Sequence, residues 1–149
     1  MNIRAIKESD KYFFAEYARE EDKAECLSVT DLPLEERIRV GVENSVESYA
    51  FVDNYDNPCA LFGLMRNGKD NLCWLLTTIL IEQHKKEYMK EVKKFVKEWY
   101  NKYGQLFVIV DIRYERAIKL IEWCKFKRNG DGIFINNFEF RIYKYAGEK

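Results

Sequence analysis

The fold is decided by residues 71–112, which read NLCWLLTTILIEQHKKEYMKEVKKFVKEWYNKYGQLFVIVDI. An apolar run at Cys73–Leu76 precedes a segment with helical spacing, and a second apolar run follows at Leu106–Val110. Short apolar runs with few charges are typical of strands that are buried on both faces. The stretch therefore predicts a strand, a long crossover helix and a second, parallel strand in the centre of a sheet.

The predicted crossover helix has one apolar face and several basic ones, because apolar residues recur every three or four positions and lysines fill the rest. The carboxyl end of the first strand and the free N–H groups of the helix meet at Thr77–Lys86, so we expect a ligand there. The apolar face holds Tyr88, Met89, Val92, Phe95, Val96 and Trp99, and the lysines are Lys85, Lys86, Lys90, Lys93, Lys94 and Lys97.

The segments before this stretch predict a strand and two or three helices. A strand at Asn2–Ile6 precedes a helix for which Ser9 or Asp10 is the natural N-cap. The charged piece that follows, at residues 19–27, is interpreted as a helix or a connecting turn. A further helix begins near Pro33 with Asp31 as its cap and extends toward Val46, because apolar residues recur there at intervals of four.

The remaining segments predict strands and one more helix. Two predicted strands joined by a turn precede the central strand. This order predicts that the three strands form an antiparallel meander. Gly104 ends the crossover helix, since glycine takes the left-handed conformation without steric cost. The predicted elements are strands at Ser48–Asp53 and Cys59–Met65, a helix around Ala117–Cys124, and a tail at Ile133–Tyr145 that forms one strand or two with a turn at Asn136-Asn137.

Composition limits the class of protein. A chain of 149 residues with 47% apolar content is long enough for one domain, expected over residues 1–149. The 25 basic residues equal the 25 acidic ones, so overall charge draws the protein neither to nucleic acid nor to an anionic membrane. No apolar run suits a spanning helix or a signal peptide, and we expect a cytoplasmic protein. One histidine and four dispersed cysteines predict no metal site and free thiols.

The order of these elements resembles the fold of the GCN5-related N-acetyltransferases. The segment YERAIKLIEWCKF is similar to that superfamily's Asn-x-x-Ala-Ile-x-x-Tyr-x-x-x-Gly-Phe pattern, and Ala117, Ile118 and Phe126 match it. The chain also resembles a tailed-phage family with an acetyltransferase-like domain. Three segments carry this resemblance: AREEDKAECLSV, ALFGL, and CWLLTT followed by EQHKKEYMKE. The resemblance implies an α/β (α+β) fold with a mixed, mostly antiparallel central sheet, a parallel β-α-β crossover and flanking helices.

The chain also departs from the pattern of active acetyltransferases. Those enzymes present a glycine-rich loop to the pyrophosphate of acetyl-CoA, whereas this chain has no glycine between Gly68 and Gly104. The Asn, Tyr and Gly positions of the superfamily pattern hold Tyr114, Ile121 and Lys125 here. Isoleucine cannot donate the proton that a tyrosine commonly gives to the leaving CoA thiolate.

The resemblance and the residue types together name candidate site residues. The resemblance implies that strand backbone pairs with the pantetheine arm, and side chains at the start of the crossover helix are the candidates to replace the glycine loop. A solvated helix face is the alternative for the lysines and His84, and a strand-end helix cap is the alternative for Asp111. The expected cofactor contacts are Leu76, Thr77, Thr78, Ile79, Gln83, His84, Lys85, Lys86 and Tyr114, and the catalytic candidates are Asp111, His84 and Glu43, with Glu47 beside the acceptor groove.

Two functions of different classes fit these observations. The first is an acetyl-CoA-dependent transfer of an acetyl group to a primary amine on a small molecule or a protein. The second is a scaffold without catalytic activity that contacts phage or host proteins in virion assembly or host takeover. Trp74, Trp99 and Trp123 are expected in the core, and the aromatic tail at Phe134–Tyr145 completes the core or pairs with a second copy in a homodimer.

Overall fold

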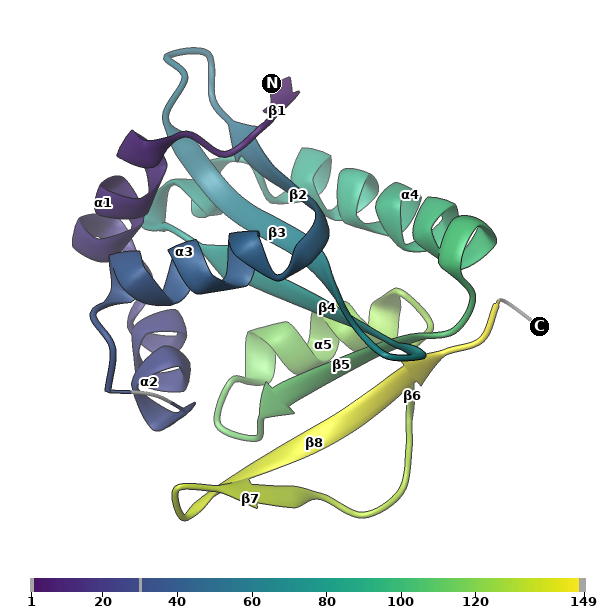
Figure 1. Ribbon diagram of the computed structural model, residues 1–149. Helices are drawn as coiled ribbons and strands as arrows, with labels where there is room; N and C mark the ends of the chain where they lie inside the picture. The colour runs from purple at the N-terminus through teal and green to yellow at the C-terminus, as the bar shows by residue number, and fades with distance from the viewer. Residues whose placement is uncertain (1, 30, 148–149) are drawn as a thin grey trace.

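The computed structural model describes residues 2–29 and 31–147, which form a mixed sheet flanked by helices (Figure 1). Among these residues the sheet has eight strands, in the order β1-β2-β3-β4-β5-β8-β6, with β7 paired to β8. Only β4 and β5 pair in parallel. The strands are β1 (Asn2–Arg4), β2 (Ser45–Val52), β3 (Pro58–Asn67), β4 (Asp70–Thr77), β5 (Leu106–Asp111), β6 (Lys127–Arg128), β7 (Ile133–Ile135) and β8 (Phe138–Tyr145).

Helices cover both faces of this sheet (Figure 1). α1 and α3 bury Phe14 and Ile38 against Leu61 of β3. α4 and α5 pack against the other face, where Phe62 points, because successive strand side chains alternate between faces. Within the described residues, no helix is both long and apolar enough to cross a membrane. The helices are α1 (Glu8–Tyr17), α2 (Glu20–Val29), α3 (Leu34–Glu43), the 3₁₀ helix η1 (Ile79–Gln83), α4 (Lys85–Tyr103) and α5 (Glu115–Trp123).

The predicted crossover unit and meander are confirmed. β4, α4 and β5 follow one another as a strand, helix and parallel strand, and both strands are central in the sheet. Strands β2, β3 and β4 form the antiparallel meander. Gly104 follows α4 with φ 91°, and the tail divides into two strands at Asn136-Asn137, where both residues have positive φ.

The predicted N-cap of α1 is wrong. The helix starts at Glu8 with Lys7 as its cap residue, so Asp10 is its third residue and Ser9 lies inside it. Asp10 still serves the helix start, because its carboxylate accepts the Lys7 N–H at 2.7 Å. The same carboxylate accepts two hydrogen bonds from Arg4 on β1, at 2.7 and 2.9 Å, and this pairing holds α1 beside the strand.

The predicted bounds of α3 are also corrected. Pro33 is the cap residue, so Asp31 lies two positions before the N-cap instead of occupying it. The helix ends at Glu43, and Glu47 belongs to β2, because that strand already pairs with β3 at Ser45. Backbone pairing with a neighbouring strand thus ends the helix earlier than its apolar spacing suggested.

The three tryptophans differ in environment. Trp99 is buried in the core of the α4–α5 face, and Trp74 packs against the cluster on the α1–α3 face. Trp123 is 40% exposed, with the Lys93 ammonium 4.8 Å from its ring centroid. The expectation of core packing is therefore wrong for Trp123, whose ring lies beside Lys93 of α4 instead of inside the buried cluster.

Candidate functional site

The central feature of the site is a gap between β4 and β5. The two strands pair only at Asn71 with Leu106 and at Leu72 with Phe107, which are the N-terminal ends of both. Beyond these pairs β4 stays with β3 and β5 stays with β8, so the two strands diverge toward their carboxyl ends (Figure 1).

Asn71 fixes the closed end of this gap. Its side chain is buried and donates to the carbonyl oxygens of Tyr103 at 3.0 Å and Gln105 at 2.9 Å. These two residues link the end of α4 to the start of β5. One side chain therefore holds the crossover helix and the parallel strand against β4, and the divergence begins immediately after it.

The peptide groups of β4 alternate between its two neighbours. Thr78 N–H donates to the Cys59 carbonyl of the β3 segment at 2.9 Å, so the strand residues of the same parity, such as Leu76, also face β3. The peptide groups of Cys73, Leu75 and Thr77 then face β5. Leu72 with Phe107 is the last β4–β5 pair, and in a parallel ladder its bonds use the peptide groups of Asn71 and Cys73. The peptide group of Leu75 therefore faces the gap.

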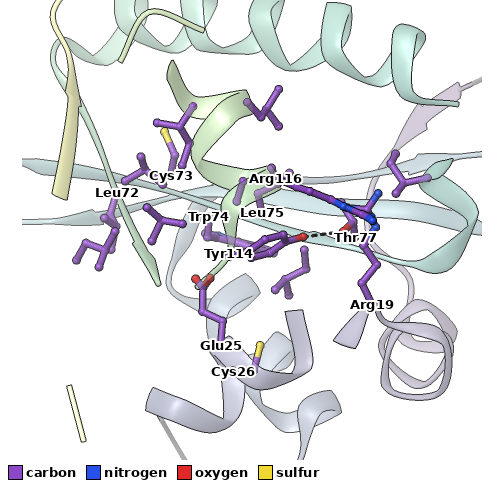
Figure 2. Close-up of a pocket in the computed structure, with 18 of the residues that line it drawn as sticks. Arg19, Glu25, Cys26, Leu72, Cys73, Trp74, Leu75, Thr77, Tyr114 and Arg116 are labelled. Carbon is purple, nitrogen blue, oxygen red and sulfur yellow. Dashed lines mark hydrogen bonds between the residues drawn. The ribbon is translucent and has the colours of Figure 1, made fainter. Parts of the chain in front are cut away.

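A cavity of about 650 Å³ occupies the gap and reaches both faces of the sheet. On the α1–α3 face its walls include Glu25 and Cys26 of α2 and Trp74 of β4, as Figure 2 shows. On the α4–α5 face they include Tyr88 and Leu120. Residues of both faces thus line one continuous space, in which a ligand on the α4–α5 side and a second ligand on the α1–α3 side would come into contact.

A buried carboxylate lies where β4 and β5 end. Asp22 of α2, only 2% exposed, accepts hydrogen bonds from the Thr77 hydroxyl at 2.7 Å, the Thr77 N–H at 3.2 Å and the Tyr114 hydroxyl at 2.8 Å. Burial raises the pKa of Asp22 to about 6, although the hydrogen bonds from Thr77 and Tyr114 oppose this rise. Figure 2 shows Tyr114 extended across the cavity toward Thr77.

Glu25 is the second carboxyl group of α2 at the cavity. It lies one helical turn after Asp22, and its carboxyl points into the cavity below Tyr114 (Figure 2). Burial, together with the negative charges of Asp22 and Asp111, raises the pKa of Glu25 to about 8. A carboxyl group with such a pKa, next to a cavity, can accept and release a proton near neutral pH.

Tyr88 contributes a hydroxyl that has no hydrogen-bond partner within the described part of the chain. The side chain is buried in the first turns of α4 and lines the cavity. Burial raises the pKa of Tyr88 well above its usual value, so the hydroxyl keeps its proton. A buried donor of this kind is costly when unpaired, and a ligand atom in the cavity would satisfy it.

Basic side chains surround the opening between α4 and α5. Lys85, Arg116 and Lys119 line this side of the cavity, and Trp123 lies at its edge. An apolar channel with a basic mouth suits a ligand that has a long neutral arm and a phosphorylated end.

The structure brings some of the sequence-predicted residues to the cavity and leaves others outside it. Leu76, Thr77, Lys85 and Tyr114 line its wall. Thr78 is buried and caps η1, because its hydroxyl accepts the Leu80 N–H at 3.3 Å. Ile79, Gln83, His84 and Lys86 lie along η1 and the start of α4 without forming part of the wall.

Glu43 and Asp111 also lie off the cavity wall. Glu43 is exposed at the end of α3 and accepts a hydrogen bond from Arg39 at 3.0 Å. Burial raises the pKa of Asp111, but the hydrogen bonds from Arg113 outweigh that effect and hold its pKa below the ordinary value. Asp111 caps the turn after β5 by accepting the Arg113 N–H at 2.9 Å, whereas Tyr114 is the cap residue of α5.

Several residues of the site were not singled out from the sequence: the buried Asp22, and the cavity-lining Arg19, Glu25, Tyr88, Arg116 and Lys119. The signal for Asp22 and Glu25 was weak, because the segment EEDKAEC has charges at nearly every position and no apolar stripe. The helical spacing predicted Tyr88 on the apolar face of α4. This prediction is correct for the buried ring, but the spacing gives no information about the position of the hydroxyl.

The sequence matches no protein-family profile and no curated protein. Solved structures are similar to it over nearly their whole length. A spermidine N-acetyltransferase SpeG variant from Vibrio cholerae has a TM-score of 0.70 at 15% identity, covering 98% of this chain and 95% of that one. A GNAT-family acetyltransferase from Bacillus anthracis has a TM-score of 0.72 at 11% identity, covering 97% and 93%. The protein smu.2055 of Streptococcus mutans has a TM-score of 0.71 at 16% identity, covering 98% and 99%.

These likenesses agree with the element order, the mixed sheet and the divergence of β4 from β5. The chain therefore has the fold of the GCN5-related N-acetyltransferases.

Proposed function

We propose that this protein is an acyl-CoA-dependent N-acyltransferase that transfers an acetyl group to a primary amine. The observation that carries the proposal is the cavity between β4 and β5, which is lined by residues from both faces of the sheet and by basic side chains on one of them. A thioester donor and an amine acceptor can approach each other through such a passage from opposite sides.

The residues on the α4–α5 side fit acetyl-CoA, which supplies the acetyl thioester when it is bound. The peptide group of Leu75 faces the gap and suits the amide groups of a pantetheine arm. Lys85, Arg116 and Lys119 suit its phosphates. The unpaired Tyr88 hydroxyl is a buried donor that such a ligand would satisfy.

The phosphate contacts come from side chains, because the segment that holds a glycine loop in active relatives is a 3₁₀ helix here. In η1 the Leu80 N–H is bonded to the Thr78 hydroxyl and the Ile81 N–H to the Thr78 carbonyl. These two backbone donors are therefore already used, and cationic side chains take over the role.

Glu25 accepts the proton of the acceptor ammonium. Its carboxyl lies on the α1–α3 side of the cavity, and its pKa of about 8 makes it a stronger base than an exposed glutamate once it is ionised. A bound ammonium would lower this pKa by charge attraction and so favour the ionised form. The amine then attacks the thioester carbon, the C–S bond breaks, and a proton of the attacking nitrogen passes to the departing thiolate, to which the Tyr88 hydroxyl donates a hydrogen bond.

Release of free thiol from acetyl-CoA in the presence of a panel of amines, spermidine included, tests this proposal. Glu25→Gln is expected to lower kcat by about 100-fold or more, which is typical for loss of a general base. Its affinity for acetyl-CoA, measured by calorimetry, stays unchanged. Glu20→Gln on the same helix is the matched control, because the Glu20 side chain is 89% exposed.

Two results would exclude the proposal. One is the absence of any thermal shift with millimolar acetyl-CoA, since a ligand that binds only the native state must stabilise it. The other is a transfer rate that Glu25→Gln leaves equal to that of the Glu20→Gln control.

A second candidate function is a scaffold that contacts phage or host proteins, as the resemblance to the tailed-phage family implied. Two observations favour it: the glycine-free 3₁₀ helix, and the β7–β8 hairpin, whose Phe134 is 71% exposed. A hairpin of this kind suits a protein partner or a second copy of the chain. Absence of acetyl-CoA binding together with a concentration-dependent oligomer would favour this candidate.

A further inference from the structure

Three cationic side chains from separate parts of the fold meet on a single carboxylate at the mouth of the cavity. Arg19, at the junction of α1 and α2, lies 2.5 Å from Glu82, and Arg116 of α5 lies 2.6 Å from it. Both guanidinium groups approach the same oxygen, Oε1, while the Lys85 ammonium lies 2.7 Å from Oε2. Figure 2 shows the Arg19 and Arg116 groups meeting at one end of the cavity.

The charges in this cluster do not balance. One carboxylate contacts three cations, which leaves an excess of two positive charges among the groups in contact, and the buried Asp22 carboxylate near Arg19 offsets this excess only in part. The Arg19 side chain is only 11% exposed at this place. Bringing two guanidinium groups to one oxygen is unfavourable unless strong negative charge holds them there. The Nε of Arg19 is in addition buried without a hydrogen-bond partner among the described residues. The cluster thus has more donors and more charge than Glu82 can satisfy.

The position of the cluster matches the phosphorylated end of the ligand discussed above. Arg19, Lys85 and Arg116 all line the cavity, and Lys85 is the first residue of α4. The cap residue His84 makes no side-chain hydrogen bond to the helix, so no capping side chain neutralises the positive end of the helix dipole. An anion placed among these side chains would interact with three cations and a helix N-terminus together.

Glu82 is suited to exchange with such an anion. It belongs to the five-residue helix η1 and its side chain is 42% exposed, so rotation into solvent needs no rearrangement of the core. The hydrogen bond from Lys85, with the nearby guanidinium charges, holds the pKa of Glu82 below its ordinary value, and the group stays anionic at neutral pH. It therefore competes with any incoming anion.

We propose that Arg19, Lys85 and Arg116 form a diphosphate-binding site, and that Glu82 occupies this site as an internal anion which the diphosphate of the ligand displaces. This inference rests on the proposed function for the identity of the ligand, and it adds how that ligand is held and selected. An anion with several negative charges interacts more strongly with the three cations than the single carboxylate that it replaces. Chloride carries one charge and therefore has no such advantage over Glu82. Glu82 therefore lowers the affinity for all anions and favours those with a diphosphate.

The test compares Glu82→Gln with the unmodified full-length protein by calorimetry, using inorganic pyrophosphate, CoA and pantetheine as three separate probes. Removal of the competing charge is expected to tighten binding of pyrophosphate and CoA by about tenfold, which equals about 1.4 kcal/mol. Pantetheine lacks phosphate and should bind both proteins equally. Glu87→Gln, in the exposed first turn of α4, is the matched control for a lost negative charge.

A second pair of variants separates the site from its internal anion. Arg116→Gln is expected to weaken binding of pyrophosphate and CoA by about tenfold or more, because it removes one charge-assisted contact to phosphate. Glu82→Ala should act in the same direction as Glu82→Gln, so the result does not depend on whether one variant folds well. Circular dichroism and the melting temperature check that each variant is folded.

The outcomes distinguish this inference from the proposed function. If both Glu82 variants bind CoA and pyrophosphate equally well or more weakly than the unmodified protein, the proposed displacement is wrong. If Arg116→Gln leaves the affinity for both ligands unchanged, the proposed diphosphate site is wrong. In either case, binding of CoA itself leaves the acyltransferase proposal intact. If pyrophosphate binds and responds to the variants as expected but neither CoA nor pantetheine binds, the anion site stands and the acyltransferase proposal falls.

Discussion

The carboxylate of Asp22 accepts a hydrogen bond of 2.8 Å from the hydroxyl of Tyr114, across 92 positions of the chain. Asp22 belongs to α2 and Tyr114 precedes α5, so this contact joins the two faces of the sheet at the open end of the gap. Thr77 completes the connection, because its hydroxyl donates to the same carboxylate oxygen at 2.7 Å. The open end is therefore held at a defined width by a buried polar network instead of by strand pairing.

Tyr114→Phe tests the strength of this network. Loss of a hydrogen bond to a buried charged group is expected to lower the free energy of unfolding by about 2 kcal/mol, measured by urea denaturation. Tyr12→Phe is the control, since Tyr12 is 58% exposed on α1. In the double variant with Asp22→Asn the losses should be less than additive, because both variants break one interaction. Fully additive losses would show that the two residues act independently.

Glu25 predicts how stability depends on pH. Its pKa rises from the ordinary 4.5 to about 8 on folding, so the folded state binds the proton more tightly than the unfolded chain. The free energy of unfolding therefore falls as pH increases from about 4.5 to about 8. Glu25→Gln does not titrate, and its melting temperature should exceed that of the unmodified protein by several degrees at about pH 8.5 and by little at about pH 5. Melting curves that shift in parallel at both pH values would contradict the raised pKa.

Gly63 and Gly41 both lie near the indole ring of Trp74, but alanine substitutions at the two positions are expected to change stability in opposite directions. A methyl group at Gly63 would lie 2.7 Å from the ring of Trp74, whereas one at Gly41 would lie 4.0 Å from it. Gly63→Ala must therefore move Trp74, weaken its 2.8 Å hydrogen bond to Ser45 and cost about 1–3 kcal/mol in unfolding free energy. Gly41→Ala lies inside α3 and should stabilise the protein by about 0.5–1 kcal/mol.

Tryptophan fluorescence provides an independent reading of the glycine variants. Displacement of Trp74 in Gly63→Ala should change the emission maximum, and Gly41→Ala should leave it unchanged. Because Trp74 lines the cavity, the first variant should also reduce affinity for the amine acceptor. If Gly63→Ala left both the stability and the emission maximum unaltered, the result would contradict the close packing of the Trp74 ring on Gly63 of β3.

Asn71 is expected to determine whether the closed end of the gap stays closed. Asn71→Ala leaves the carbonyl oxygens of Tyr103 and Gln105 without their donor in a buried place and should cost about 2–3 kcal/mol. Hydrogen exchange of the β5 amides should accelerate as well, because the strand loses its attachment to β4. Asn101→Ala, at an exposed position of α4, is the control and should change stability by less than about 0.5 kcal/mol.

The sequence by itself determined the crossover unit and the meander, and it offered a turn at Asn136-Asn137 as one of two alternatives for the tail. These features follow from local patterns, because an apolar run marks a buried strand, three- and four-residue spacing marks a helix face, and Asn tolerates positive φ. The missing glycine loop was equally visible, since it depends only on which residues follow β4.

Only the tertiary structure decided which charged residues form the site. Whether Asp22 is buried and Glu25 faces a cavity depends on how α2 packs beneath the ends of β4 and β5, and no periodicity within EEDKAEC encodes that packing. The convergence of Arg19, Lys85 and Arg116 on Glu82 likewise joins three separate segments. Local patterns specify which face of an element is buried, whereas a gap between diverging strands and the charges at its mouth arise from contacts between distant parts of the chain.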